Sequence, residues 1–247
     1  MILVDTVYQR VLALANKEQR GYITPQEFNL LANQAQMEIF EQYFYDLNQW
    51  NKQPENDTEF SGMLNLLEEK IRLFEEEQGG AGFLVAQGGG AMVIPSEVYR
   101  IGTVRIGGTQ VEMLTSKQFD AVRFSYLTSP TPKRPIGYIT SDGLWIAIGG
   151  ANPTTGSTSG TFVNTNTNTN INLSYIKKPH KVIWGYTVIN DKALYNSGSS
   201  VNFELHQSEE TELVYKILSL AGIVIAKPGL GTYADQQITA QKTQEKQ

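Results

Sequence analysis

The sequence predicts an α+β fold, with a helical body made from both ends of the chain and an antiparallel β-domain inserted between them. Helical periodicity of apolar residues dominates residues 1–80 and returns in residues 203–231. Between them, in residues 81–202, the apolar pattern becomes strand-like and is broken by glycine turn signals. Each helical part would leave an apolar stripe in water, so we expect the C-terminal helix to pack on the N-terminal helices. Residues 232–247 are polar and are predicted to form a flexible, extended arm.

The first helix is expected over about residues 5–20. Val7, Val11 and Leu14 recur at helical spacing, and Asp5 or Thr6 can cap the start. The second helix has the clearest start signal of the chain, because Thr24 supplies a capping hydroxyl and is followed by proline and, three residues on, by glutamate.

The second helix is predicted to continue to about residue 47, and the face opposite its apolar stripe is polar but uncharged. The residues on that face are Asn29, Asn33, Gln34, Gln36 and Gln42. Carboxamides can pack against another polar surface without burying charge. The alternative is ordinary exposure to solvent. A third helix is predicted over residues 58–78, with the acidic residues 75–77 solvated at its C-terminal end, where the helix dipole disfavours anions.

The central segment is expected to hold about six to eight antiparallel strands. Gly107-Gly108 and Asp142-Gly143 are two-residue hairpin signals between strand-like runs. A short helix is predicted over residues 116–124, and further strands over residues 171–177 and 182–188. Residues 151–170 are of low complexity and predict a long mobile loop.

Composition narrows the class of function. The chain has 247 residues, a net charge of −5 and no cysteine. A tight nucleic-acid binder needs clustered Lys and Arg, which do not occur here. Disulfides and thiolate metal sites are excluded, and no run approaches the roughly 20 apolar residues of a membrane span. The N-terminal residues lack the pattern of a signal peptide.

Enzyme signatures are poor. His180 and His206 are the two histidines, and neither stands at a metal-ligand spacing. No Gly-x-Ser-x-Gly nucleophile motif occurs. We therefore expect no catalytic residue, no metal and no cofactor. The alternative from another class is a carbohydrate-binding or depolymerising protein, which would use paired carboxylates and a face of aromatic side chains. The candidates for that alternative are Glu97, Glu112, Asp120, Asp142, Trp145 and Trp184. A packed β core is the other, favoured interpretation of the aromatic residues.

Four segments carry a resemblance to a known family. They are the opening of the second helix (residues 22–42), the proline-rich entry to a hairpin (130–138), the Tyr-basic-Pro-aromatic stretch (175–184) and the last helix (203–220). In this order they resemble the head-to-tail adaptor, or connector ring, proteins of short-tailed bacteriophages, including the ring proteins of crAss-like phages. The Asn-Thr-rich stretch within 151–170 departs from the family pattern.

The resemblance implies a non-enzymatic virion protein of the neck, assembled in the host cytoplasm. Subunits of that family close into a ring, usually dodecameric, which docks on the portal, extends the channel for double-stranded DNA and supports the tail. Their C-terminal arm commonly docks into the portal, and here that role would fall on Tyr233, Gln236, Gln237 and Ile238. Another ring, or a tail-tube-like protein of the same stack, is the near alternative.

Overall fold

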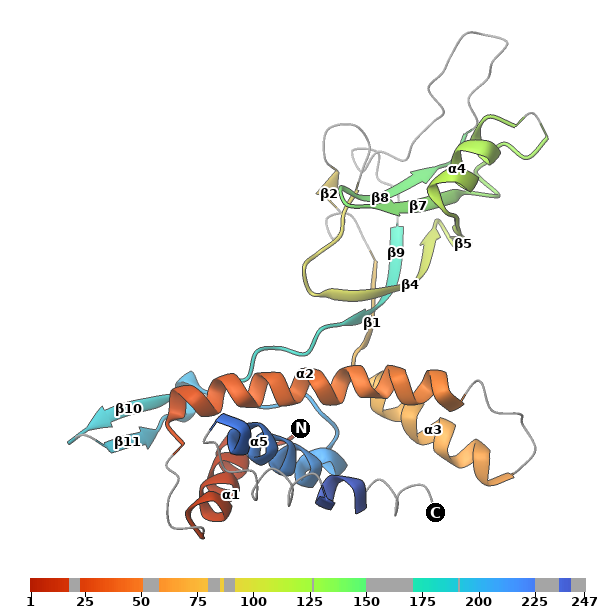
Figure 1. Cartoon of the computed structure of the whole chain (residues 1–247). Helices are drawn as coiled ribbons and strands as arrows, with labels where there is room; N and C mark the ends of the chain where they lie inside the picture. Colours follow the sequence, from red (N-terminus) through yellow and green to blue (C-terminus); the bar gives the residue numbers. More distant parts are fainter. Residues whose placement is uncertain are drawn as a thin grey trace. The chain divides into compact units, whose positions relative to one another are not determined.

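A computed structural model shows the chain and describes residues 1–17, 23–50, 58–79, 85–86, 92–125, 127–149, 171–190, 192–224 and 236–240 (Figure 1). The predicted α+β class is confirmed. The chain divides into two compact units, which we call the helical unit (Met1–Leu73 with Pro179–Gln247) and the sheet unit (Phe74–Lys178). The inserted unit therefore begins earlier and ends much earlier than the predicted 81–202.

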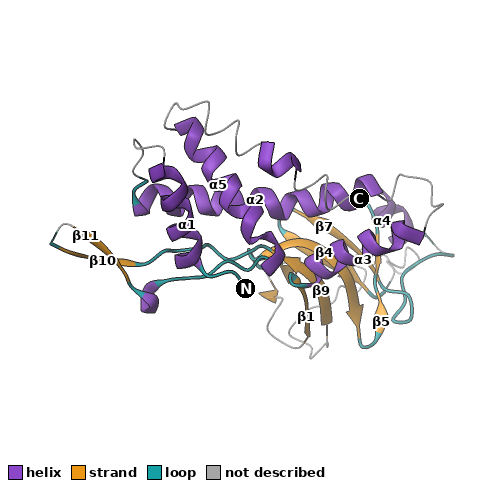
Figure 2. Cartoon of the chain, turned by 90° about the horizontal axis from the view of Figure 1, so that it is seen from below, coloured by secondary structure: helices purple, strands orange, loops and turns teal. Residues whose placement is uncertain are grey.

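The helical unit takes elements from both ends of the chain, and helices and strands are distinguished by colour in Figure 2. Its helices are α1 (Val4–Lys17), α2 (Pro25–Trp50), α3 (Thr58–Arg72) and α5 (Glu210–Val224), with the short 3-10 turns η2 (Ser197–Ser199) and η3 (Gln207–Glu209). Its strands are β10 (Tyr186–Ile189) and β11 (Lys192–Tyr195). The predicted capping box is present, because the Thr24 amide donates to Glu27 Oε2 (2.9 Å) and the Glu27 amide donates to Thr24 Oγ1 (3.3 Å).

Helix α5 contacts both α1 and α2, and the interface is apolar. Phe28 and Ile39 of α2 and Leu213 and Ile217 of α5 are at most 2% exposed. Burying each such side chain stabilises the fold by roughly 1.5–3 kcal/mol. Two ion pairs lie along the same helix, Arg10–Glu210 (2.8 Å) to α1 and Lys216–Glu38 (3.0 Å) to α2.

The acidic run at residues 75–77 is not the end of a helix, so that prediction is wrong. Helix α3 ends at Arg72, and Glu75–Gly79 forms strand β1. Strand β1 pairs antiparallel with β9 (Ile171–Lys177), in a register that places Glu75 opposite Ile176. The partner strand lies about a hundred residues away in the sequence, and its hydrogen bonds outweigh the local helical preference of a glutamate run.

The sheet unit contains two sheets. The first has the order β1-β9-β4-β5 and the second β2-β3-β8-β7-β6. Their remaining strands are β2 (Val85–Ala86), β3 (Met92–Val93), β4 (Val98–Ile106), β5 (Thr109–Gln110), β6 (Glu112–Met113), β7 (Ile136–Thr140) and β8 (Gly143–Ala147). Both predicted hairpins are confirmed, with Gly107, Gly108 and Gly143 at positive φ. The pairing of β6 with β7 is parallel, so the sheets are not purely antiparallel as expected.

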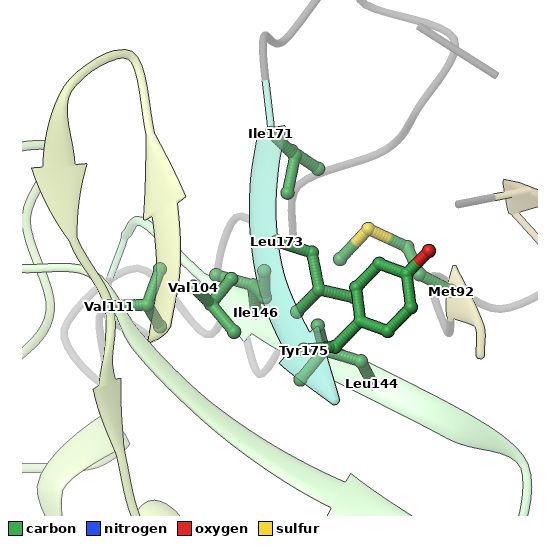
Figure 3. Close-up of a cluster of buried hydrophobic side chains, with 8 residues drawn as sticks. All are labelled: Met92, Val104, Val111, Leu144, Ile146, Ile171, Leu173 and Tyr175. Carbon is green, nitrogen blue, oxygen red and sulfur yellow. The ribbon is translucent and has the colours of Figure 1, made fainter. Parts of the chain in front are cut away.

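One apolar core joins the two sheets (Figure 3). Strand β9 contributes Leu173 and Tyr175, strand β4 contributes Val104, and strand β8 contributes Leu144 and Ile146. The predicted short helix is present as α4 (Ser116–Arg123), and it buries Phe119 against β7 and β8 in a smaller cluster.

Two segments differ from their predicted secondary structure. Residues 182–188 were expected to be a strand of the inserted domain, but they lie in the helical unit, and the strand β10 begins only at Tyr186. Residues 236–240 are helical rather than extended. The predicted mobile loop at 151–170 lies outside the described residues.

Candidate functional site

The two histidines are engaged at the surface. His180 Nδ1 lies 2.7 Å from Glu204 Oε1, and its side chain is 62% exposed. His206 Nδ1 lies 2.8 Å from Ser208 Oγ and accepts the Ser208 amide at the start of η3. Among the residues that the structure describes, no group of three or more His, Asp or Glu side chains could hold a metal ion. The His206 side chain thus caps η3, whereas the His180 side chain pairs with the Glu204 carboxylate.

The residues considered for a sugar-binding face do not come together. Trp184 is 3% exposed and belongs to the helical unit, whereas Trp145 is half-buried on β8 of the sheet unit. Trp145 stacks on Tyr138, with ring centroids 6.2 Å apart. Glu112 forms an ion pair with Arg134 (3.0 Å). Trp184 is a core residue, so it is excluded as a candidate for a surface that binds sugars.

The proposed arm residues are only partly described. Gln236, Gln237 and Ile238 lie in the helical segment 236–240, and Tyr233 lies outside the described residues. Gln236 is exposed and Gln237 half-buried. Ile238 is 8% exposed, so its side chain already has neighbours within the chain. Of the described residues predicted to dock, Gln236 is the most exposed.

Within the helical unit, carboxamide side chains of α2 form a row of hydrogen bonds to backbone groups, which we call the carboxamide ladder. Asn33 Nδ2 donates to the Val182 carbonyl (2.8 Å), and the Val182 amide donates to Asn33 Oδ1 (2.9 Å). Asn29 makes the same pair of bonds with the backbone of Trp184, at 3.3 and 2.7 Å. These side chains offer a neighbouring peptide the donor and acceptor that a β-strand would offer.

The ladder continues at Gln36, which is 2% exposed. Gln36 Nε2 donates to the His180 carbonyl (2.8 Å), and Gln36 Oε1 accepts the Glu204 amide (3.4 Å). The spacing of these hydrogen bonds follows from the rise per residue of a helix and of a strand. Four residues of helix advance about 6 Å, and two residues of strand advance about 6.6 Å. Positions 29, 33 and 36 on one helix face therefore meet alternate residues of an extended segment, which we call the return segment (residues 180–184).

The other edge of the return segment is paired as well. Ile183 and Val201 exchange both backbone hydrogen bonds, at 3.2 and 2.8 Å. Phe203, two residues further on, donates its amide to the Ile2 carbonyl (3.1 Å). The return segment is thus held between α2 and residues 201–203, which in turn bind the N-terminus.

Trp184 anchors the end of the return segment in aromatic contacts. Its ring lies 4.3 Å from Tyr8 of α1 and 5.8 Å from both Tyr186 and Tyr195, measured between centroids. Its indole Nε1 donates to Asp5 Oδ1 (3.0 Å). Tyr186 and Tyr195 are the paired residues at the base of the β10–β11 hairpin. The base of that hairpin is therefore fixed to α1.

A buried ion pair fixes α3 to the start of α5. Lys70 Nζ lies 2.5 Å from Glu209 Oε1, and the side chains are 7% and 2% exposed. The ammonium also lies 5.9 Å from the centre of the Tyr43 ring on α2. A charge pair of this burial requires close geometry, since desolvating either charge alone costs several kcal/mol.

The two strands that enter and leave the sheet unit are tied to each other. Strands β1 and β9 are neighbours, Lys177 Nζ binds Glu76 Oε1 (2.9 Å), and Tyr175 Oη donates to Glu76 Oε2 (3.0 Å). Burial, followed by the hydrogen bond to Glu76 and the charge of that carboxylate, raises the pKa of Tyr175 to about 12. Tyr175 thus stays protonated and donating throughout the physiological range.

Sequence reasoning found part of this arrangement. The uncharged face of α2 was visible from its amide spacing, but its partner, the backbone of residues 180–184, was not. Lys70 and Glu209 gave no signal beyond an ordinary charged residue, and Asp5, considered as a helix cap, lies within α1 and accepts the indole N–H of Trp184. No protein family model matches the chain, and no curated protein matches it. In the described part of the chain, no helix is both long and apolar enough to cross a membrane.

Proposed function

We propose that the chain is a non-enzymatic virion protein, a head-to-tail adaptor or neck ring subunit that docks on the portal, extends the DNA channel and supports tail attachment. The observation that carries the proposal is the closure of one helical unit from both chain ends, with a separate sheet unit inserted between them. A ring subunit needs a rigid body for its neighbours, and a second unit can present a platform to the next component.

The carboxamide ladder supports this proposal because it gives the helical unit a fixed closure. The chain leaves the helical unit after α3 and returns along α2 through hydrogen bonds at Asn29, Asn33 and Gln36. Both edges of the return segment are occupied. A subunit that transmits load between a head and a tail benefits from a closure of this kind, which offers no free strand edge at that point.

The distribution of charge suits a conduit for DNA. The helical unit has 18 acidic and 12 basic side chains, and the sheet unit has 7 and 8. Neither unit has the large basic excess that would hold phosphates tightly and release many counterions. DNA would therefore slide past such a subunit without being retained by it.

Portal docking is tested by comparing two variants of the C-terminal region. Gln236→Ala combined with Tyr233→Ala should weaken co-sedimentation with the portal protein of the same virus and leave thermal unfolding unchanged. Ile238→Ala is the matched control. It removes a buried side chain, so it should lower the stability of the fold. If the chain that carries both Gln236→Ala and Tyr233→Ala still binds the portal, the assignment of the C-terminal arm to portal docking fails. If the wild-type chain ignores the portal, the adaptor proposal itself fails.

The rival function, binding of carbohydrate by a tail protein, rests on Trp145 stacked with Tyr138 in the sheet unit. A glycan array followed by Trp145→Ala separates the two proposals. Specific glycan binding that this substitution abolishes would favour the rival. Absence of glycan binding together with assembly on the portal would favour the adaptor.

A further inference from the structure

The β10–β11 hairpin is an apolar ribbon with water on both faces. Its pairs are Tyr186 with Tyr195, Thr187 with Leu194, Val188 with Ala193 and Ile189 with Lys192. Because directly opposed residues share a face, Val188 and Ala193 lie on one face, and Ile189 and Leu194 lie on the other. Val188 is 64% exposed, Ile189 53% and Leu194 49%. Apolar side chains thus face solvent on both sides of the ribbon.

A hairpin that is exposed on both faces lacks the packing that would stabilise it. An isolated two-stranded hairpin is marginal in water. Here the base is held, because Tyr186 and Tyr195 pack on Trp184, but the part beyond the base has no neighbour among the described strands. Figures 1 and 2 both show the hairpin extending away from the helices of its own unit. Its four-residue strands span roughly 13 Å, enough to reach the surface of another molecule.

The same helical unit carries a hollow of matching chemistry between α1 and α5. Its volume is about 300 Å³. Ala13 and Leu14 come from α1, and Val214 and Tyr215 come from α5. The Arg10–Glu210 ion pair joins the two helices beside them. Arg10, the charged residue of the lining, is thus already paired with Glu210, and apart from Thr211 the other walls are aliphatic and aromatic.

We propose that the β10–β11 hairpin of one copy inserts its Val188 and Ile189 end into the α1–α5 hollow of the next copy. The inference deepens the proposed function and rests on it, because a contact between two different surfaces of the same chain repeats head to tail. Such a heterologous contact closes into a ring when the rotation between copies permits. A contact of Val, Ile and Leu with an apolar hollow also stabilises by burial rather than by charge.

The nature of this contact predicts its response to salt. The helical unit has a net excess of acidic side chains, so neighbouring copies repel each other at low ionic strength. Raising the salt screens that repulsion and leaves the apolar contact in place. Assembly should therefore persist or strengthen at high salt, and dissociation by salt would argue for a charged interface instead.

Cysteine cross-linking tests the contact directly, because the chain has no native cysteine. Full-length Val188→Cys and full-length Ala13→Cys are prepared separately, mixed and oxidised. Both positions are exposed, so neither change disturbs the core. We expect a disulfide-linked dimer that requires both variants, and a ladder of higher species when both changes are placed in one chain. Leu127→Cys, which is 96% exposed in the sheet unit, is the control partner for Ala13→Cys and should give no link.

Four outcomes overturn the proposal. A dimer from Val188→Cys alone indicates a symmetric hairpin contact. A link from Ala13→Cys to Leu230→Cys, with none to the hairpin, assigns the hollow to the C-terminal segment. Rings seen by electron microscopy without any Val188–Ala13 link overturn the contact and leave the proposed function standing. A chain that neither links nor assembles, with or without portal, overturns both.

Discussion

Asn33 on α2 and Val182 on the return segment exchange two hydrogen bonds, 2.8 Å from the Asn33 amide to the Val182 carbonyl and 2.9 Å from the Val182 amide to the Asn33 carbonyl oxygen. The Asn33 side chain supplies the hydrogen-bond donor and acceptor that the backbone of a neighbouring strand would supply in a sheet. The pair joins residues that are 149 positions apart. It closes the helical unit after the chain has passed through the sheet unit.

Removal of this pair should be costly. Asn33→Ala leaves an amide and a carbonyl of Val182 without partners, so we expect a loss of roughly 2–6 kcal/mol of unfolding free energy, about 1–3 kcal/mol for each part-buried group. Asn33→Asp keeps the acceptor but places a carboxylate against the Val182 carbonyl, and it should also destabilise. The measurement is denaturant unfolding together with hydrogen exchange of residues 180–184. Gln34→Ala, an exposed amide on the adjoining position, is the control and should change little. Equal effects at 33 and 34 would contradict the ladder.

The buried Lys70–Glu209 pair should behave differently from the surface pair of the same unit. Lys70→Met or Glu209→Leu alone leaves one buried charge unpaired and should cost about 3–5 kcal/mol, whereas the double variant should recover most of that loss. Arg10→Ala breaks an ion pair whose arginine is 54% exposed, and it should cost less than about 1 kcal/mol. A double-mutant cycle by thermal unfolding measures the coupling. Additive effects of the two buried substitutions would refute the pairing.

Tyr175 should make the sheet unit sensitive to alkali. Its pKa is raised from 10.0 to about 12, so the folded unit holds the phenol proton more tightly than the unfolded chain does. The resulting stabilisation is complete below pH 10 and is lost as the pH rises toward 12. Tyr175→Phe lacks the hydrogen bond to Glu76, and should be less stable at neutral pH but lose less stability over that alkaline window. Stability followed against pH for wild type, Tyr175→Phe and the exposed Tyr45→Phe checks this. Parallel curves for all three would show that Tyr175 has no special role.

The turn of the β7–β8 hairpin should tolerate no side chain. Gly143 has φ +136°, and a Cβ there would lie 2.2 Å from the Met92 carbonyl oxygen on β3. Gly143→Ala should therefore disrupt the pairing of β3 with β8 and destabilise the sheet unit. Gly107→Ala is the matched control, since φ is also positive (+52°) but nothing lies within 4 Å of the new carbon. It should cost only about 1–2 kcal/mol. Circular dichroism during thermal unfolding compares them, and a larger loss at 107 would contradict the close contact at 143.

Local signals in the sequence predicted the elements that local physics controls. The capping box at Thr24, the glycine turns at 107–108 and 142–143 and the short helix α4 were all found, because each depends on residues within a few positions. The α+β class followed from the same periodicities. These elements needed no information about distant partners.

The predictions that failed depend on partners far away in the sequence. The glutamates of β1 become a strand because β9 pairs with them, and residues 182–188 leave the predicted domain because Asn29 and Asn33 bind their backbone. The sequence left Trp184 as a candidate for either a core or a sugar face for the same reason, since its aromatic neighbours come from α1 and the hairpin. No local pattern contains these pairings.

The central proposal, that this chain is a ring subunit of the neck, is tested most directly by electron microscopy of the full-length protein mixed with the portal protein of the same virus, with light scattering for the mass. The proposal predicts closed rings, seated coaxially on the portal, with a mass of many subunits. A protein that remains a monomer in both samples and leaves the portal bare would contradict it.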